Sequence, residues 1–86
     1  MASENNSFTV MIVREAGTIH YGKCQALFVP SLDGEIVVLP YHTPMIAKLG
    51  KGEVSIRDGR IKNIITNIET GLIYVGDNEV TVLVDL

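Results

Sequence analysis

Apolar and polar residues alternate with a period of two through most of the chain, and this alternation predicts short β-strands. The segment Phe8–Val13 shows the pattern, because its alternate apolar residues share one face of a strand, and they are Phe8, Val10 and Ile12. The opposite face carries Met11 and Val13, so it is not a plain water-facing surface. This strand is therefore either covered on both sides or meets a partner with its outer face.

The stretch from Val29 to Gly52 holds all 3 prolines of the chain, so its backbone repeatedly stops and changes direction. Between the prolines lies one apolar run, Ile36–Leu39, which is short and rich in β-branched residues and predicts a single strand. Ser31–Gly34 predicts a turn before it, because Asp-Gly is a strong turn signal. Loops fixed by proline are stiff, and stiff exposed loops suit recognition.

Two segments on either side of this region also predict strands. Lys23–Val29 alternates and predicts one continuous strand. Met45–Leu49 is a short apolar piece between a proline and a glycine, which favours a strand over a helical turn.

A hairpin is predicted where Asp58–Gly59 separates two alternating runs, Glu53–Arg57 and Arg60–Ile65. A two-residue turn at that place sets Ile56 opposite Ile61.

A second hairpin is predicted at the end of the chain. If its turn contains Asp77 and Asn78, Val75 pairs with Val80 and Ile73 with Val82. The apolar faces of both strands then coincide, so register and pattern agree.

No segment shows the 3.6-residue apolar period of a longer helix. The predicted fold class is all-β, a small sandwich of about ten short, mostly antiparallel strands in two packed sheets. Residues 8–86 form the single predicted domain. Residues 1–7 are polar and acidic and are predicted to be a flexible N-terminal tail.

Composition and charge exclude several classes of function for this protein. The net charge of −3 argues against a nucleic-acid partner, because phosphates bind basic surfaces. No apolar run approaches the roughly 20 residues of a membrane span, so direct membrane insertion is not expected. The first residues lack the basic and apolar parts of a signal peptide, which predicts that the protein stays in the compartment where it is made. The single cysteine, Cys24, lies in an alternating run and is expected to be a buried free thiol.

Side chains with catalytic chemistry are few. A Ser-His-Asp site would need Ser31 or Ser55 beside His42, and neither serine lies in a nucleophile-elbow pattern. The acidic pair Asp33 and Glu35 flanks a turn glycine, which is typical of a solvated turn. The sequence therefore predicts no catalytic, cofactor or metal site.

Three groups of residues resemble the signature of a known family. They are Val29-Pro30, then Asp33-Gly34-Glu35, then Leu39-Pro40-Tyr41-His42-Thr43-Pro44. Their order and spacing are similar to V-P-G-x-x-G-E-x-G-I-L-P-G-H-A-P in the epsilon subunit of F-type ATP synthases. The closing run, from Gly71–Val75 to Val80–Asp85, resembles the family's G-x-L-E-V…V-T-V-L-A-D. The resemblance covers nearly the whole chain, with departures at three glycines of the signature, replaced by Ser31, Val37 and Tyr41.

The resemblance implies a non-catalytic β-sandwich at the foot of the ATP synthase central stalk. The implied partners are the gamma subunit on one side and the rotor ring of c subunits on another. The ring side is implied for residues of the proline-rich stretch, namely Glu35, Leu39, Pro40, His42 and Met45. Met11 and Val13 are expected on the gamma side. The implied location is peripheral, on the cytoplasmic face of the bacterial inner membrane or the equivalent face in an organelle.

Members of this family usually continue into a helical hairpin that regulates ATP hydrolysis and, in some, binds ATP. This chain stops at Leu86, which is expected of either a naturally short form or an excised amino-terminal domain. No tight ATP binding is expected in these residues, because the family's nucleotide contacts belong to the hairpin. An alternative is a small adaptor or carrier domain of the lipoyl type, which needs a lysine at an exposed hairpin tip. Lys51 and Lys62 are not expected at such a tip.

Overall fold

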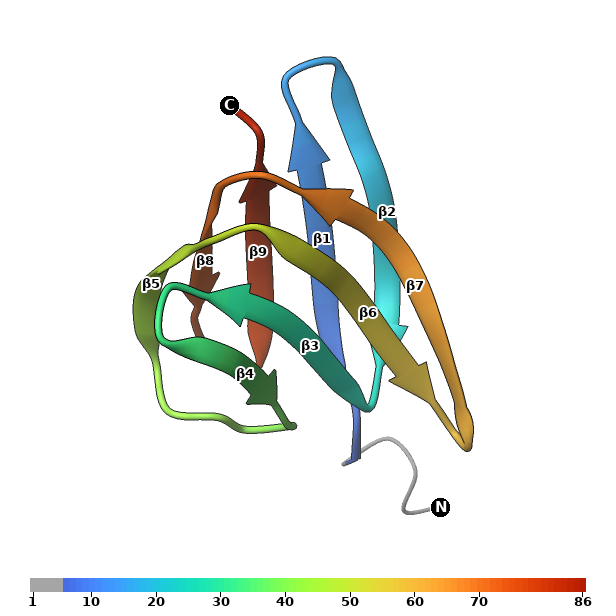
Figure 1. The fold of residues 1–86 in the computed structure, drawn as a ribbon. Coiled ribbons are helices and arrows are strands. Elements are labelled where there is room, and N and C mark those ends of the chain that lie inside the picture. Colours follow the sequence, from blue (N-terminus) through green and yellow to red (C-terminus); the bar gives the residue numbers. More distant parts are fainter. Residues whose placement is uncertain (1–5) are drawn as a thin grey trace.

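Nine β-strands make up the fold in the computed structural model, which describes residues 6–86 (Figure 1). In chain order they are β1 (Phe8–Arg14), β2 (Gly17–Cys24), β3 (Ala26–Ser31), β4 (Gly34–Val38), β5 (Met45–Leu49), β6 (Gly52–Asp58), β7 (Ile61–Ile68), β8 (Gly71–Val75) and β9 (Glu79–Val84). Most of the predicted tail, residues 1–5, lies outside the described residues. Within the described part no helix is long and apolar enough to cross a membrane. The all-β class is confirmed.

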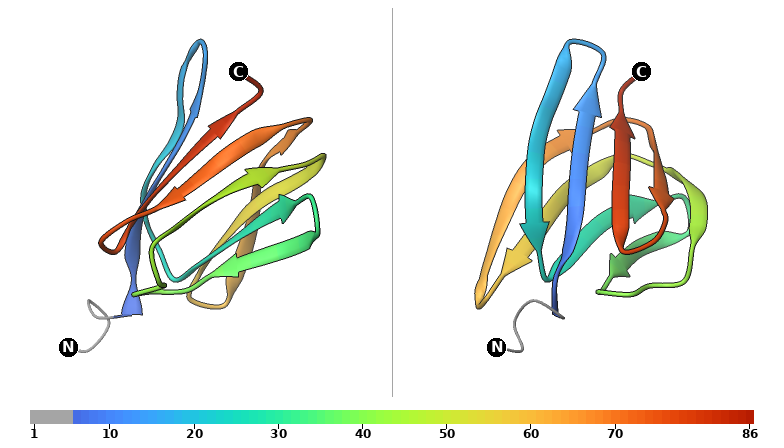
Figure 2. Two further views of the ribbon diagram at one scale, coloured as in Figure 1. Left: turned by 90° about the vertical axis from the view of Figure 1, so that its left-hand side faces the viewer. Right: turned by 180° about the vertical axis from the view of Figure 1, so that it is seen from behind.

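The strands form two layers that pack face to face (Figure 2). One layer has the order β2-β1-β9-β8-β5, and the other has the order β4-β3-β6-β7. The layers are joined along one side, where Ser31 of β3 pairs with Leu49 of β5. Among residues 6–86 every pairing is antiparallel except that of β1 with β9, in which Thr9 lies opposite Glu79. The two-layer, mostly antiparallel arrangement agrees with the sequence prediction.

The core lies between the two layers and is built from the inward-facing residues of the strands. Its buried members include alternate residues of the neighbouring strands β1 and β9, which are Phe8, Val10, Ile12, Val80, Val82 and Val84. In the closing hairpin Val75 pairs with Val80 and Ile73 with Val82, so the predicted register is confirmed. Each fully buried valine or isoleucine contributes roughly 1.5–3 kcal/mol of hydrophobic stabilisation.

The predicted continuous strand Lys23–Val29 is wrong, because the chain breaks at Gln25 and passes there from one layer to the other. The backbone N–H of Gln25 donates to the carbonyl of Arg57 at 2.8 Å. The side-chain Oε1 of Gln25 accepts a hydrogen bond from the backbone N–H of Gly59 at 2.7 Å. These bonds to a distant hairpin hold the bend, and local alternation does not reveal them.

The hairpin of β6 and β7 was predicted correctly, but its register was not. Ile56 pairs with Asn63 and not with Ile61, since the two-residue loop is Gly59–Arg60. The glycine of this loop has a φ of 69°. It therefore occupies the first loop position, where a type II′ turn requires a positive φ.

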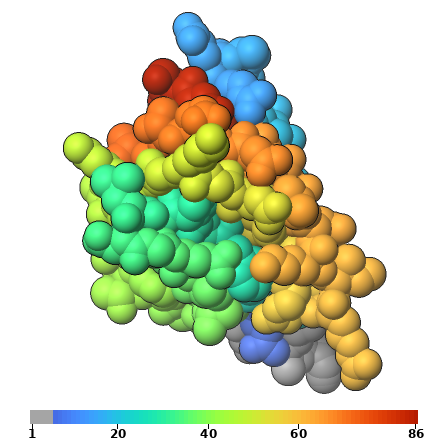
Figure 3. All heavy atoms as spheres, viewed as in Figure 1, coloured from blue at the N-terminus to red at the C-terminus, as the bar shows by residue number. Residues whose placement is uncertain are grey.

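The connections gather at two opposite ends of the sandwich. The β1–β2 turn, the β7–β8 turn and the end of β9 lie at the top of Figure 1. The β4–β5 loop and the β8–β9 turn lie at the bottom of the same view. Figure 3 shows the outer face of the β4-β3-β6-β7 layer, with the β1–β2 turn projecting above it in blue. The lower end carries most of the residues that the sequence assigned to partner contacts.

Candidate functional site

The loop between β4 and β5, Leu39–Pro44, contains a defined turn. The backbone N–H of His42 donates to the carbonyl of Leu39 at 3.2 Å, so four residues close a turn with Pro40 in second position. Tyr41, in third position, has a φ of 62°. Proline followed by a residue of positive φ is the pattern of a type II turn. Glycine is the usual third residue, because a side chain in the left-handed region costs about 1 kcal/mol.

Asn78 of the β8–β9 turn holds this loop in place. Its side-chain Oδ1 accepts a hydrogen bond from the backbone N–H of Tyr41 at 2.8 Å. Its Nδ2 donates to the carbonyl of Ser7 at 3.0 Å. One side chain therefore connects the β4–β5 loop to the residue before β1. We call Leu39–Pro44 together with Asn78 the loop end.

The residues expected on the ring side lie partly at the loop end. Leu39 is exposed, and Pro40 and His42 are half-buried in the turn. Met45 is half-buried at the start of β5. Glu35 is exposed on β4, at the far end of that strand from the loop. The structure thus brings four of these five residues together and sets the carboxylate apart.

The outer face of the β2-β1-β9-β8-β5 layer is largely apolar, and this layer is nearest the viewer in the right panel of Figure 2. Strand pairing aligns one row of side chains across all five strands, in the order Tyr21, Met11, Thr81, Tyr74 and Ile46. Tyr21 is 70% exposed, Tyr74 56% and Ile46 69%. A neighbouring row contains Val13, Leu83 and Leu72. We call these residues the apolar face: Met11, Val13, Tyr21, Ile46, Leu72, Tyr74 and Leu83.

The apolar face continues into an open groove of about 340 Å³ at one edge of the layer. The groove is lined mainly by leucines, which are Leu32, Leu49, Leu72, Leu83 and Leu86. Of the residues of the apolar face, only Met11 and Val13 were predicted from the sequence to lie on a partner surface. The outward residues of β8 carried a comparable signal, because Leu72 and Tyr74 alternate with buried residues yet are themselves apolar.

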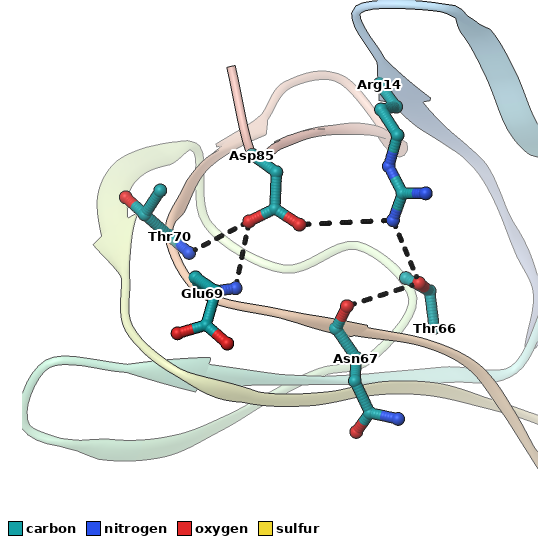
Figure 4. Close-up of polar contacts among 6 residues, drawn as sticks. All are labelled: Arg14, Thr66, Asn67, Glu69, Thr70 and Asp85. Atoms are coloured by element: carbon teal, nitrogen blue, oxygen red, sulfur yellow. Dashed lines mark hydrogen bonds and ion pairs between the residues drawn. The ribbon is translucent and has the colours of Figure 1, made fainter.

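At the opposite end Asp85 fastens the end of β9 to the β7–β8 turn (Figure 4). Its Oδ1 accepts hydrogen bonds from the backbone N–H groups of Glu69, at 2.8 Å, and Thr70, at 3.2 Å. These bonds, more than the nearby guanidinium of Arg14, lower the pKa of Asp85 below its ordinary value of 3.8. Arg14 Nη2 lies 3.9 Å from Asp85 Oδ2 and donates to Thr66 Oγ1 at 3.2 Å. We call these five residues the clasp, since they join β1 of one layer to β7 of the other.

The nucleophilic side chains considered in the sequence analysis are either buried or hydrogen-bonded within a turn. Cys24 is a buried free thiol, as predicted, and burial raises its pKa to about 11. Ser31 Oγ donates to the carbonyl of Gly34 at 2.6 Å and accepts from the N–H of Asp33 at 3.1 Å. Ser55 is buried. Within residues 6–86 no three histidine, cysteine, aspartate or glutamate side chains are placed to hold a metal ion.

The lipoyl-type alternative requires a lysine at a hairpin tip. Gly59 and Arg60 form the tip of the β6–β7 hairpin. Lys62 lies beyond that tip on β7, and its Nζ sits 4.0 Å from the centre of the Phe28 ring. The geometry therefore does not favour a carrier lysine at this place.

Comparison with known proteins identifies relatives along almost the whole chain. Residues 7–86 match the family model described as ATP synthase, Delta/Epsilon chain, beta-sandwich domain. An ATP synthase epsilon chain of Leptospira borgpetersenii is 36% identical over 81 residues, which are 93% of this chain and 62% of that protein. An ATP synthase epsilon chain of Lactiplantibacillus plantarum is 35% identical over 89 residues, covering 99% of this chain and 61% of that protein. The chain thus spans a little under two thirds of the length of these relatives.

Two solved structures share the fold. A chain of the Euglena gracilis mitochondrial ATP synthase, in a structure that contains the c-ring, superposes with a TM-score of 0.83 at 21% identity. That superposition covers 92% of this chain and 51% of the other. A chain in the central stalk and c-ring structure of the Tetrahymena thermophila enzyme gives a TM-score of 0.71 at 13% identity, covering 88% of this chain and 61% of the other. At these identities the likeness establishes the fold alone.

Proposed function

The chain belongs to the family of ATP synthase delta and epsilon chain β-sandwich domains, and from this premise we propose that it is a non-catalytic, epsilon-type part of the central stalk. In this role it links the gamma subunit to the c-subunit ring and supports the coupling of proton flow to ATP synthesis. Its location is then peripheral, on the cytoplasmic face of the bacterial inner membrane or the equivalent organelle face.

The apolar face is the observation that carries the proposal. Apolar side chains line the outer face of five adjacent strands, with tyrosines at two positions of one row. Those on β2, β8 and β5 are exposed, and those on β1 and β9 are half-buried. Removing apolar surface from water is favourable by roughly 25 cal/mol per Å². Tyrosine is also enriched where protein partners meet. This face therefore suits a lasting contact with another subunit, and we assign it to gamma.

The loop end supports a second, separate contact. The type II turn and its bond to Asn78 limit the freedom of the loop before any partner arrives, which reduces the entropy lost on docking. Leu39 and Pro40 offer apolar contact, and His42 offers an imidazole that already lies 2.7 Å from the carbonyl of Thr43. We assign this end, together with the exposed carboxylate of Glu35, to the ring.

A binding role also agrees with the state of the reactive groups. The thiol of Cys24 stays protonated at neutral pH because its pKa is about 11. The hydroxyl of Ser31 is held by its own turn. Both groups are used inside the fold, which suits a subunit that transmits torque without reacting.

The gamma assignment is tested by a matched pair of charge insertions. Ile46→Lys places a cation on the apolar face, and Ile64→Lys places one at a similarly exposed position, 58%, on the other layer. We expect Ile46→Lys to weaken binding to purified gamma subunit by at least about tenfold, because an unpaired charge would be desolvated. Ile64→Lys should bind like the unmodified chain. Equal affinities of the two variants would contradict the assignment.

The ring assignment is tested by a second pair that changes the same charge. Glu35→Lys alters the carboxylate on β4 that is assigned to the ring, whereas Glu15→Lys alters an exposed carboxylate of the β1–β2 turn. In membranes reconstituted with stalk and ring, we expect Glu35→Lys to lower proton-coupled ATP synthesis more than Glu15→Lys, and more than His42→Ala. An exposed ion pair contributes only about 0–1 kcal/mol, so the loss should be partial and weaker at high salt. A loss of coupling with Glu15→Lys of the same size would remove the reason for assigning Glu35 to the ring.

A further inference from the structure

Tyr41 combines an unfavourable backbone with a side chain that the described fold does not use. Its φ of 62° lies in the left-handed region, which disfavours any residue with a Cβ. Its side chain is 63% exposed, and within residues 6–86 its phenol takes part in no recorded hydrogen bond. The family signature that the sequence resembles has glycine at this place. Glycine would relieve the backbone without removing any contact from the core.

The fold supports this backbone with a second residue. The N–H of Tyr41 points to the Oδ1 of Asn78, at 2.8 Å, and Asn78 is itself anchored through its Nδ2 to the carbonyl of Ser7. Asn78 also has a positive φ, of 53°. Two non-glycine residues thus adopt left-handed conformations on either side of one hydrogen bond. Backbone strain that is held in place by neighbouring groups is a feature of binding sites.

We propose that Tyr41 is an anchor residue of the loop end for the polar loops of the c-subunit ring, and that Asn78 is the residue that positions it. This inference rests on the proposed function and adds a contact residue to it. A tyrosine supplies a large rigid ring with two side-chain torsions, so little entropy is lost when it docks. Its hydroxyl can donate to a carbonyl of a ring loop while its apolar body packs beside Leu39 on the same turn.

Tyr41→Gly tests the side chain without disturbing the turn, because glycine adopts the positive φ and the substitution removes only the side chain. The probe is detergent-solubilised c-ring from the same organism, immobilised and exposed to the full 86-residue chain. We expect the Tyr41→Gly chain to bind at least about tenfold more weakly, although it melts at the same temperature or higher. Ile64→Ala, which truncates an exposed apolar side chain on the outer face of the other layer, should leave ring affinity unchanged. Tyr41→Phe measures the part played by the hydroxyl.

Asn78→Gly tests the positioning role with the backbone geometry preserved. Losing the acceptor should speed hydrogen exchange of the Tyr41 amide at least about tenfold, while the amide of Val82 in the core exchanges as before. Asn78→Asp keeps an acceptor for Tyr41 but loses the donor to Ser7, so the Tyr41 amide should stay protected. Ring affinity should fall in Asn78→Gly and not fall further when Tyr41→Gly is added. An unchanged exchange rate of the Tyr41 amide in Asn78→Gly would refute the positioning role.

The binding measurements distinguish an error in the anchor role of Tyr41 from an error in the proposed function. If the unmodified chain binds the ring and Tyr41→Gly binds equally well, the anchor role is wrong and the proposed function stands. If the unmodified chain does not bind the ring, the ring assignment and the anchor role are both wrong. The exchange measurements need no ring, so the positioning role is decided in either case.

Discussion

Asp85 and Tyr41 share an unusual backbone but lie at opposite ends of the sandwich. Asp85 has a φ of 51° at the end of β9, and Tyr41 has a φ of 62° in the β4–β5 loop. At Asp85 the residue's own carboxylate provides the compensation, through two backbone hydrogen bonds and the nearby Arg14. At Tyr41 the compensation comes from Asn78, and the tyrosine side chain stays in solvent. The side chain of Asp85 therefore makes contacts within the domain, whereas the side chain of Tyr41 is exposed.

This difference distinguishes residues that stabilise the fold from residues that are available to contact a partner. Aspartate tolerates the left-handed region because its short polar side chain bonds to nearby backbone groups. Tyrosine has no such local bond, so its presence there has no explanation inside the domain. The clasp should therefore respond to substitution mainly in stability, and the loop end mainly in binding.

The largest effect on stability is expected from the core that both ends share. Val82 is fully buried between Ile12 and Ile73 on the neighbouring strands. Val82→Ala should lower the free energy of unfolding by roughly 1–3 kcal/mol, because it leaves a small cavity. Urea unfolding followed by tyrosine fluorescence and by circular dichroism should give one coincident transition. Separate transitions from the two probes would mean that the ends unfold independently.

A smaller loss of stability is expected when the hydrogen bonds of the clasp are removed. Asp85→Ala removes the acceptor for Glu69 and Thr70, so the melting temperature should fall by several degrees. Asp85→Asn keeps an amide oxygen in the same place and tolerates the positive φ, so it should recover most of the loss. Scanning calorimetry of both variants provides the check. Equal melting temperatures for Asp85→Ala and Asp85→Asn would show that the hydrogen bonds contribute little.

Acid should weaken the clasp in a defined pH range. The pKa of Asp85 in the folded chain lies below its ordinary value of 3.8, so the ionised carboxylate stabilises the fold above that pH. This contribution is lost as the pH falls from 3.8 through the lower folded pKa. The stability difference between the unmodified chain and Asp85→Asn should be constant near neutral pH and shrink in that acid range. Urea titrations at several pH values measure it, and a difference that persists unchanged in strong acid would contradict the lowered pKa.

The smallest effect on stability is expected at the loop end, and its sign is opposite. Tyr41→Gly relieves the left-handed backbone and should raise the free energy of unfolding by up to about 1 kcal/mol. Tyr41→Ala keeps a Cβ and should change it little. Urea unfolding of the two variants side by side is the measurement. A glycine variant no more stable than the alanine variant would show that Tyr41 carries no backbone strain.

The local sequence pattern predicted strand pairing correctly where both paired strands carry alternating buried residues. The alternating valines of β9 and the paired residues of β8 specified the closing hairpin correctly. The same reasoning failed at Gln25, where a backbone bond to Arg57 turns the chain. It also misplaced the β6–β7 loop, because Asp-Gly marks a turn without stating which residue comes first in it.

The candidate contact surfaces were predictable to different degrees. Prolines marked the β4–β5 loop, since their effect on the backbone is local. Asn78 was missed because its bonds reach Tyr41 across 37 residues and Ser7 across 71. The apolar face was predicted only from β1, because assigning Tyr21 and Ile46 to the same row requires the pairing of five strands. The partner assignments of these surfaces remain predictions.

The parallel pairing of β1 with β9 has a consequence for how the chain folds. Thr9 cannot meet Glu79 until all the strands between them have been made, so the pairing of β1 with β9 depends on residues that are far apart in the sequence. Closing so long a loop before any stabilising contact forms slows folding, and proteins rich in such contacts fold in milliseconds to seconds. During synthesis on the ribosome, the open edge of β1 therefore stays without its partner until the last strand emerges. A chaperone that covers this edge in the interval would raise the yield of folded protein, whereas it would leave the finished sandwich unaffected.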